Sequence, residues 1–186
     1  MQKLLLPLLV VLLIVNRSFA DKAASIPSPD KHYVIAFSGS NSALPQAFTI
    51  QDSRGVVMVS SREISRLQDI AEFPRDHVLW SPDSQIVALA GGGGHDLATF
   101  IFVRRGGTFA LVEVPDVTGD HDNPYITPLR WLPGRRLVLD ISGPHAGRSP
   151  GYRYTGKATI CIPNARSVCE VLYKQISEHH YKDEDA

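Results

Sequence analysis

Trp80-Ser81-Pro82-Asp83 stands shortly before the apolar run Ile86-Val87-Ala88-Leu89, and this combination decides the fold because it recurs along the chain. Upstream, Pro27-Ser28-Pro29-Asp30 comes before a second apolar run, and downstream Trp131-Leu132-Pro133-Gly134 comes before a third. The aligned prolines are 53 and then 51 residues apart. A period near 50 residues indicates a repeat architecture, of which a propeller is one example.

Each copy predicts the same succession of β-strands. A turn leads into a first strand, and a polar or glycine-rich loop then leads into a β-hairpin, with valine, isoleucine, phenylalanine and threonine in the strands. The hairpins are expected over residues 47–59, 99–114 and 158–173, and strands over 76–80 and 125–131 are expected to complete the first two units. The expected fold is therefore all-β, built from three antiparallel β units.

One segment departs from the β pattern. Ser60 and Glu63 have the spacing of a capping box, and apolar residues follow at helical intervals from Ile64 to Ile70. This pattern predicts one short amphipathic helix over residues 61–71.

The combination of tryptophan, serine, proline, aspartate and glycine before an apolar strand resembles the repeat of TolB-type (WD40-like) β-propellers. The copies in this chain are degenerate. The expected glycine is Lys31 in the first copy and Ser84 in the second, while Gly134 takes the aspartate position in the third. Ile26 stands where the first copy would have tryptophan.

The resemblance implies three propeller-blade-like units, each a four-stranded sheet, with residues 23–27 supplying the missing strand of the third unit. Propellers typically have about four to eight blades, so three blades leave apolar outer faces without a neighbour. Two expectations follow. Either a partial propeller is completed by further copies, for example in a homodimer, or the units collapse into a barrel or sandwich around one core.

The first twenty residues have the pattern of a secretory signal peptide. Lys3 provides a positive charge, residues 4–15 are apolar, and Ser18 and Ala20 place small side chains before the expected cleavage site. The apolar run is too short to cross a bilayer core as a helix. We therefore expect residues 1–20 to be removed, leaving a periplasmic or secreted protein that is not embedded in a membrane.

The rest of the chain is expected to form a β-repeat domain over residues 21–176 and a disordered acidic tail over 177–186. The full chain has 19 basic and 19 acidic residues, and the loss of Lys3 and Arg17 with the leader would leave a net charge of about −2. This balance gives no reason to expect nucleic acid as a partner.

The two cysteines, Cys161 and Cys169, are the only ones in the chain. An even number of cysteines in an exported protein favours a disulfide. Folding the third hairpin about Ala165 would place them opposite each other. The sequence therefore predicts a disulfide between them.

Candidate site residues lie in the predicted loops. Asn41, His95 and His145 follow their turns at matching distances, and a second loop carries an Asp-His-Asp run. Loops of this kind are expected to emerge on one face. The candidate binding residues are His95, Asp96, Asp120, His121, Asp122, His145, Arg148 and Tyr152, with Tyr125 and Tyr154 as further interface types.

Two functions remain open from these residues. The first is an exported, non-catalytic protein-binding module that needs no cofactor and whose partner protein is unknown. The alternative is a metal-dependent hydrolase or lyase that uses His95, Asp120, His121 and His145, because histidine and carboxylate are metal-ligand types.

Overall fold

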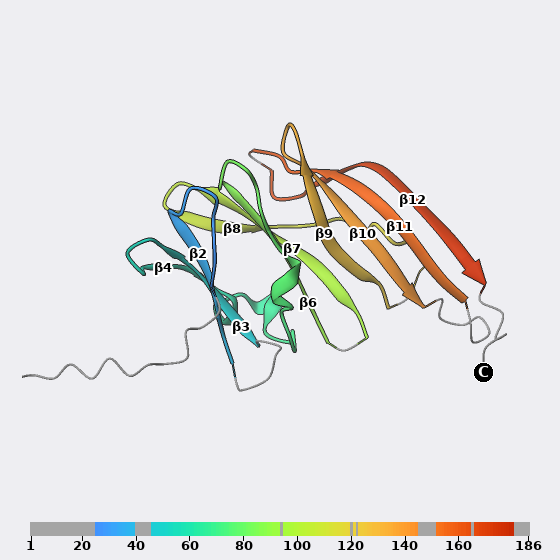
Figure 1. The fold of residues 1–186 in the computed structure, drawn as a ribbon, viewed down its shortest axis with the longest axis horizontal. Coiled ribbons are helices and arrows are strands. Elements are labelled where there is room, and N and C mark those ends of the chain that lie inside the picture. The colour runs from blue at the N-terminus through green and yellow to red at the C-terminus, as the bar shows by residue number, and fades with distance from the viewer. Residues whose placement is uncertain are drawn as a thin grey trace, which may run out of the picture.

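Three four-stranded antiparallel meanders follow one another along the chain (Figure 1). The structure is a computed structural model that describes residues 25–39, 46–93, 95–119, 121, 123–144, 152–164 and 166–180. The first unit consists of β1 (Ser25–Pro27), β2 (Tyr33–Ser38), β3 (Ala47–Asp52) and β4 (Val57–Ser60). The second consists of β5 (Val78–Trp80), β6 (Ile86–Gly92), β7 (Leu97–Arg105) and β8 (Thr108–Val112). The third consists of β9 (Tyr125–Leu132), β10 (Arg136–Pro144), β11 (Tyr152–Cys161) and β12 (Glu170–His180).

The first unit is a sheet of its own, whereas the second and third share one sheet. They are joined where β7 and β9 run parallel through the single pair Leu97 and Tyr125. Within the described residues neither sheet closes on itself: β1 and β4 are the ends of one, and β5 and β12 are the end strands of the other path. The prediction of an all-β fold is thus confirmed, and no closed barrel is formed by these strands.

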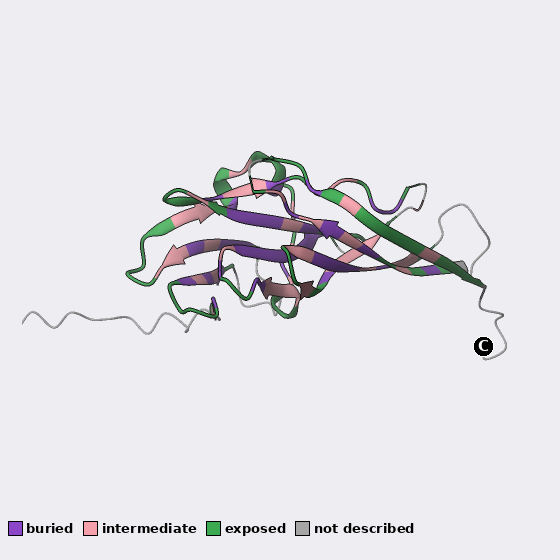
Figure 2. Ribbon diagram, turned by 90° about the horizontal axis from the view of Figure 1, so that it is seen from above, coloured by how far each residue is buried: buried purple, intermediate pink, exposed green. Residues whose placement is uncertain are grey.

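The second unit is buried on both faces. In β6, Ile86 and Ala88 belong to the core shared with the third unit, while Val87 and Leu89 belong to the core shared with the first. All seven residues of β6 are buried, and buried positions gather on the interior strands (Figure 2). A strand covered on both faces needs apolar residues at successive positions, which explains the unbroken run in this strand.

The first two proline-aspartate turns have the same hydrogen bonds. Each serine hydroxyl donates to the aspartate carboxylate at 2.6 Å, Ser28 to Asp30 and Ser81 to Asp83. The same hydroxyl accepts from the amide that opens the next strand, at 3.0 Å from Tyr33 and 2.9 Å from Ile86. The residue after each aspartate has a positive φ, 61° at position 31 and 58° at position 84.

These turns close hairpins, and this changes which strands belong together. β1 pairs with β2, β5 with β6 and β9 with β10. The expectation that residues 76–80 and 125–131 end the first two units was therefore wrong, because each begins the next unit. Residues 25–27 likewise complete the first unit and not the third. A turn this tight brings its two flanking strands side by side as an antiparallel pair.

The predicted helix over residues 61–71 was also wrong. Two separate 3₁₀ turns, η1 (Ser61–Glu63) and η2 (Ser65–Leu67), occupy this segment, and a third, η3 (Arg75–His77), precedes β5. Ile64 between the first two is extended, with φ −103° and ψ 110°. The apolar spacing nevertheless identified core contacts, since Leu67 is buried and Ile64 and Ile70 pack against the first core.

The predicted disulfide is not formed, because the two cysteines point to opposite faces. Cys161 pairs in register with Glu170, so Cys169, one residue earlier, turns its side chain the other way. Backbone bonds to Glu113 fix this arrangement: its N–H donates to Ser167 at 2.7 Å, and its carbonyl accepts from Cys169 at 2.8 Å. Burial, with a further contribution from nearby Cys161, raises the pKa of the Cys169 thiol to about 12.

The third unit differs from expectation at its end and on its outer face. β12 continues to His180, four residues beyond the expected domain boundary at 176, while residues 181–186 and 1–24 lie outside the described part of the chain. The outer face carries polar side chains, among them Thr155, Lys157, Gln175 and Ser177. This face therefore does not need an apolar neighbour. Among the described residues no helix has the length and apolar character needed to cross a membrane.

Candidate interaction surface along strand β12

The predicted loop cluster is only partly within the described residues. Asn41, Asp120, Asp122, His145, Arg148 and the side chain of Tyr152 lie outside them. His95 and Asp96 are exposed in the turn between β6 and β7, where the His95 amide donates to the Gly93 carbonyl at 2.7 Å. Among the residues that the structure describes, no three histidine, cysteine or carboxylate side chains are grouped as metal ligands.

Among the candidates that the structure describes, His121 is the one whose ring contacts side chains of β11 and β12. Its ring is 18% exposed, and its Nδ1 is 2.8 Å from the Thr118 carbonyl. Its Nε2 is 3.5 Å from a carboxylate oxygen of Glu178 on β12, and its ring centroid is 4.4 Å from that of Tyr154 on β11. These contacts hold His121, which precedes β9 in the chain, against β11 and β12.

Asp116 holds the start of the same segment. Its carboxylate accepts from the Thr118 amide and hydroxyl, both at 2.8 Å, and from the Gly119 amide at 3.0 Å. These bonds, led by the one from the Thr118 backbone and aided by the charge of Lys174, hold the pKa of Asp116 below its usual value. The described residues 116–119 and 121 therefore lie beside β12, with Asp116 near Lys174 and His121 near Glu178.

β12 itself is the longest strand of the described chain and an edge of its sheet. It pairs with β11 on one side, and no other strand pairs with it among the described residues. The register shifts between Thr159 and Ile160, so that Leu172 is the extra residue of a bulge. Leu172 is 48% exposed and Tyr173 is 54% exposed. An edge strand of this kind presents backbone N–H and C=O groups without a strand partner.

The outer face of β12 is ordered by its own hydrogen bonds. The Tyr173 hydroxyl donates to the side-chain carbonyl of Gln175 at 2.6 Å. The Thr155 hydroxyl on β11 is 3.0 Å from Nε2 of His179. Both contacts limit the freedom of side chains that border the open edge.

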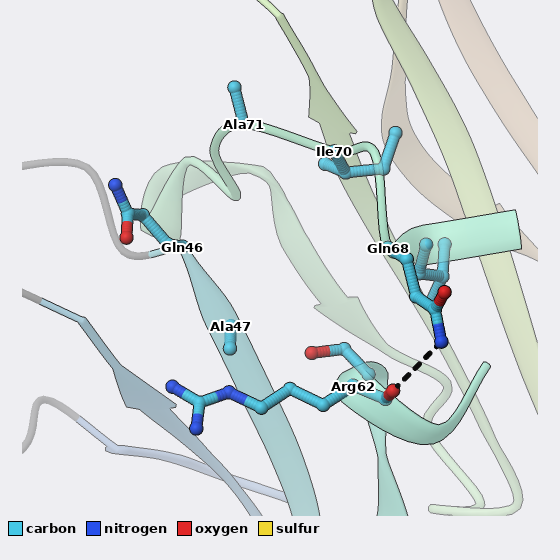
Figure 3. A pocket seen from close by; sticks show the side chains of 8 residues that line it. Gln46, Ala47, Arg62, Gln68, Ile70 and Ala71 are labelled. Carbon is cyan, nitrogen blue, oxygen red and sulfur yellow. Dashed lines mark hydrogen bonds between the residues drawn. The ribbon is translucent and has the colours of Figure 1, made fainter. Parts of the chain in front are cut away.

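Two hollows are lined by residues outside β12. One of about 450 Å³ is at the ends of β9 to β11 and is lined by Tyr125, Ser142, Gly143, Pro144, Arg153, Tyr154 and Thr155. Tyr125 and Tyr154 thus lie in strands: Tyr125 begins the strand expected over 125–131, and the expectation that both tyrosines lie in loops was wrong. The other, of about 360 Å³, is beside β3 and the first two 3₁₀ turns (Figure 3), and among its described lining residues Arg62 is the charged one.

The contribution of β12 to the surface was missed from the sequence. The stretch Glu170–His180 alternates too irregularly to predict a long strand, since the bulge at Leu172 interrupts the period of two. The polar residues after Ile176 then resembled a frayed tail. β12 nearly matches β11, which has ten residues, in length, but this match is visible only in the structure and the sequence offered no local signal for the strand.

Comparisons with models of protein families, with curated proteins and with solved structures found no match for this chain. The function is therefore argued from the geometry of the third unit.

Proposed function

We propose that this chain is an exported, non-catalytic protein-binding module of propeller-like type, which binds a partner by adding an extended segment to β12. The observation that carries the proposal is the open side of β12, eleven residues long, with Leu172 and Tyr173 exposed beside it. In strand addition, backbone hydrogen bonds give affinity and alternate side chains give specificity.

The propeller-like part of the proposal is supported by the order of the three meanders. Each is a four-stranded antiparallel sheet, and the buried second unit shares one core with each neighbour. The matching hydrogen bonds of the first two turns support the resemblance to TolB-type repeats. Export is supported by the leader pattern in residues 1–20, and an intact mass that begins at Asp21 is the expected result for the exported protein.

The binding edge is tested by photo-crosslinking. A photoreactive amino acid replaces Leu172 in the bulge of β12, and in a control it replaces Val56, which is 54% exposed in the first unit. We expect the probe at position 172, in the native envelope, to give a discrete adduct whose crosslinked peptide is an extended segment. The probe at position 56 should not give this adduct.

Two results would contradict the proposed function. One is equal crosslinking from positions 172 and 56, which would mean that exposure alone determines the adduct. The other is the absence of any discrete adduct from position 172 when the protein is present at its natural level.

A further inference from the structure

The sequence of β12 indicates which chain can pair at its open edge. Successive side chains of a strand alternate between the two faces of the sheet. Those on the inner face include Lys174, Ile176 and Glu178, because they lie opposite Ala158, Gly156 and Tyr154 of β11. The outer face carries Tyr173, Gln175, Ser177 and His179.

We propose, on the basis of the proposed function, that a second copy of this chain binds there, with the two β12 strands antiparallel about a two-fold axis at Ile176. In this register Lys174 lies opposite Glu178 of the second copy, and the symmetry repeats the pair. Ile176 then meets its own counterpart. On the outer face Gln175 lies opposite Ser177, and Tyr173 lies opposite His179.

The alternative registers lack this complementarity. An axis at Gln175 places Lys174 opposite Ile176, and an axis at Ser177 places Ile176 opposite Glu178, so each sets a charge against an aliphatic side chain. An axis between two residues would pair inner-face with outer-face positions. Opposite charges facing each other across a strand pair are stabilising, and like charges are destabilising. The charge pattern therefore selects the axis at Ile176.

The two charged side chains are already positioned by their own chain. The Lys174 Nζ lies beside Gly119, 3.5 Å from where a Cβ on that residue would stand, and near the Asp116 carboxylate. Glu178 is 3.5 Å from His121. Because the groups are partly ordered before association, pairing immobilises fewer free side chains. The bulge at Leu172 limits the paired stretch to residues 173–179.

Light scattering over a dilution series of the mature protein tests this pairing. We expect a mass of two chains at high concentration. Lys174→Glu sets like charges opposite each other at both symmetric positions, and we expect it to raise the dimer Kd about tenfold. Adding Glu178→Lys to that variant restores opposite charges, and the Kd should return to within about threefold of the starting value. Lys157→Glu, the same charge change on β11 away from the edge, is the matched control and should leave the Kd unchanged.

A single-chain mass at all concentrations would overturn the inference. The inference would also fail if the double variant Lys174→Glu/Glu178→Lys dimerises no better than Lys174→Glu alone, while circular dichroism shows that all variants are folded. If the protein is monomeric but the probe at position 172 crosslinks a different protein, the second copy is wrong and strand addition at β12 stands. If the protein is monomeric and no adduct forms, both proposals fail.

Discussion

The junction between the first and second units is packed with aromatic rings, whereas the junction between the second and third is packed with aliphatic side chains. At the first junction, Phe48 meets Phe73 and Phe102 edge-to-face, with centroids 5.0 and 5.6 Å apart. Tyr33 meets Phe109 in the same way at 5.1 Å. Such pairs add to the stabilisation from burial alone.

The second junction adds hydrogen bonds to backbone carbonyls, one from a backbone amide and one from a side-chain hydroxyl. Leucine and isoleucine side chains of β10, among them Leu139, share a core with those of β6 and β7. The Leu97 amide donates to the Pro124 carbonyl at 2.9 Å, and the Thr99 hydroxyl donates to the Ile126 carbonyl at 2.7 Å. The first unit has no strand pairing with the second among the described residues.

The repeated turns also meet differently at the two junctions. At the first, the Asp30 amide donates to the Ser84 hydroxyl at 3.1 Å, and the Trp80 indole donates to the Ile26 carbonyl at 3.2 Å. At the second, Arg135 occupies the position of Ser84, but its side chain donates within the third unit, to the Ile162 carbonyl at 3.1 Å. A hollow of about 280 Å³ remains there beside Trp131. At the second junction, where the turn sequence departs from the motif, the units are connected by backbone pairing between β7 and β9.

The largest expected effect is at the aromatic junction. Phe48→Ala should lower the free energy of unfolding by about 3–5 kcal/mol, because it removes a fully buried ring and leaves a cavity. Since side chains make this junction, the first unit should then unfold before the other two. Leu139→Ala, at the other junction, should lower stability in a single transition. Urea unfolding followed by fluorescence and circular dichroism measures whether each variant unfolds in one step or two. If only Leu139→Ala unfolds in two steps, the second junction and not the first is the weaker connection between units.

Removing a tryptophan hydrogen bond should also cost more stability at the first junction than at the second. Trp80→Phe removes the bond to Ile26 in a buried position and should cost about 1–2 kcal/mol. Trp131→Phe removes a longer bond, 3.4 Å to Leu79, from a half-buried position and should cost less than about 1 kcal/mol. Chemical denaturation of both variants measures the difference. Equal losses of unfolding free energy in the two variants would mean that the hollow beside Trp131 does not weaken its hydrogen bond to Leu79.

The smallest expected effect depends on pH. Burial alone would raise the pKa of Asp30, but hydrogen bonds from Ser28, His32 and Ser84 outweigh it and lower the pKa. A lowered folded-state pKa stabilises the protein above the ordinary carboxyl pKa of about 4, and this stabilisation is lost as the pH falls below it. Asp30→Asn should therefore be destabilising near neutral pH and less so in acid. An equal loss at both pH values, measured by urea unfolding, would show that the charge of Asp30 is not involved.

The three units and their hairpins could be predicted from the sequence, because turn residues and apolar runs are local signals. Which strands share a unit could not, since a 50-residue spacing is the same whether the turn after Trp80 lies within a unit or between two. The helix was predicted from the spacing of Ile64, Leu67 and Ile70, but an extended Ile64 gives similar core contacts. The disulfide was predicted from the hairpin, and a shift of one residue in register placed Cys169 on the other face.

Most of the candidate surface could not be predicted either, because it depends on register and strand order and not on local sequence signals. His121 was selected as a binding residue because of its residue type. In the structure its ring lies against Glu178 and Tyr154. The open edge of β12 depends on which strand ends the sheet, and this is a property of the whole topology. No short motif in residues 170–180 reports it.

Residue-resolved amide hydrogen exchange tests the central claim, that β6 is enclosed on both faces while β12 keeps one open edge. The measurement uses NMR on a chain of residues 21–186, diluted until light scattering gives the mass of one chain. We expect the slowest exchange in β6 and, in β12, fast exchange at every second amide, because only alternate amides bond to β11. Uninterrupted protection along β12 in the monomer would mean that the edge is already paired within the chain, and β12 would then have no open edge.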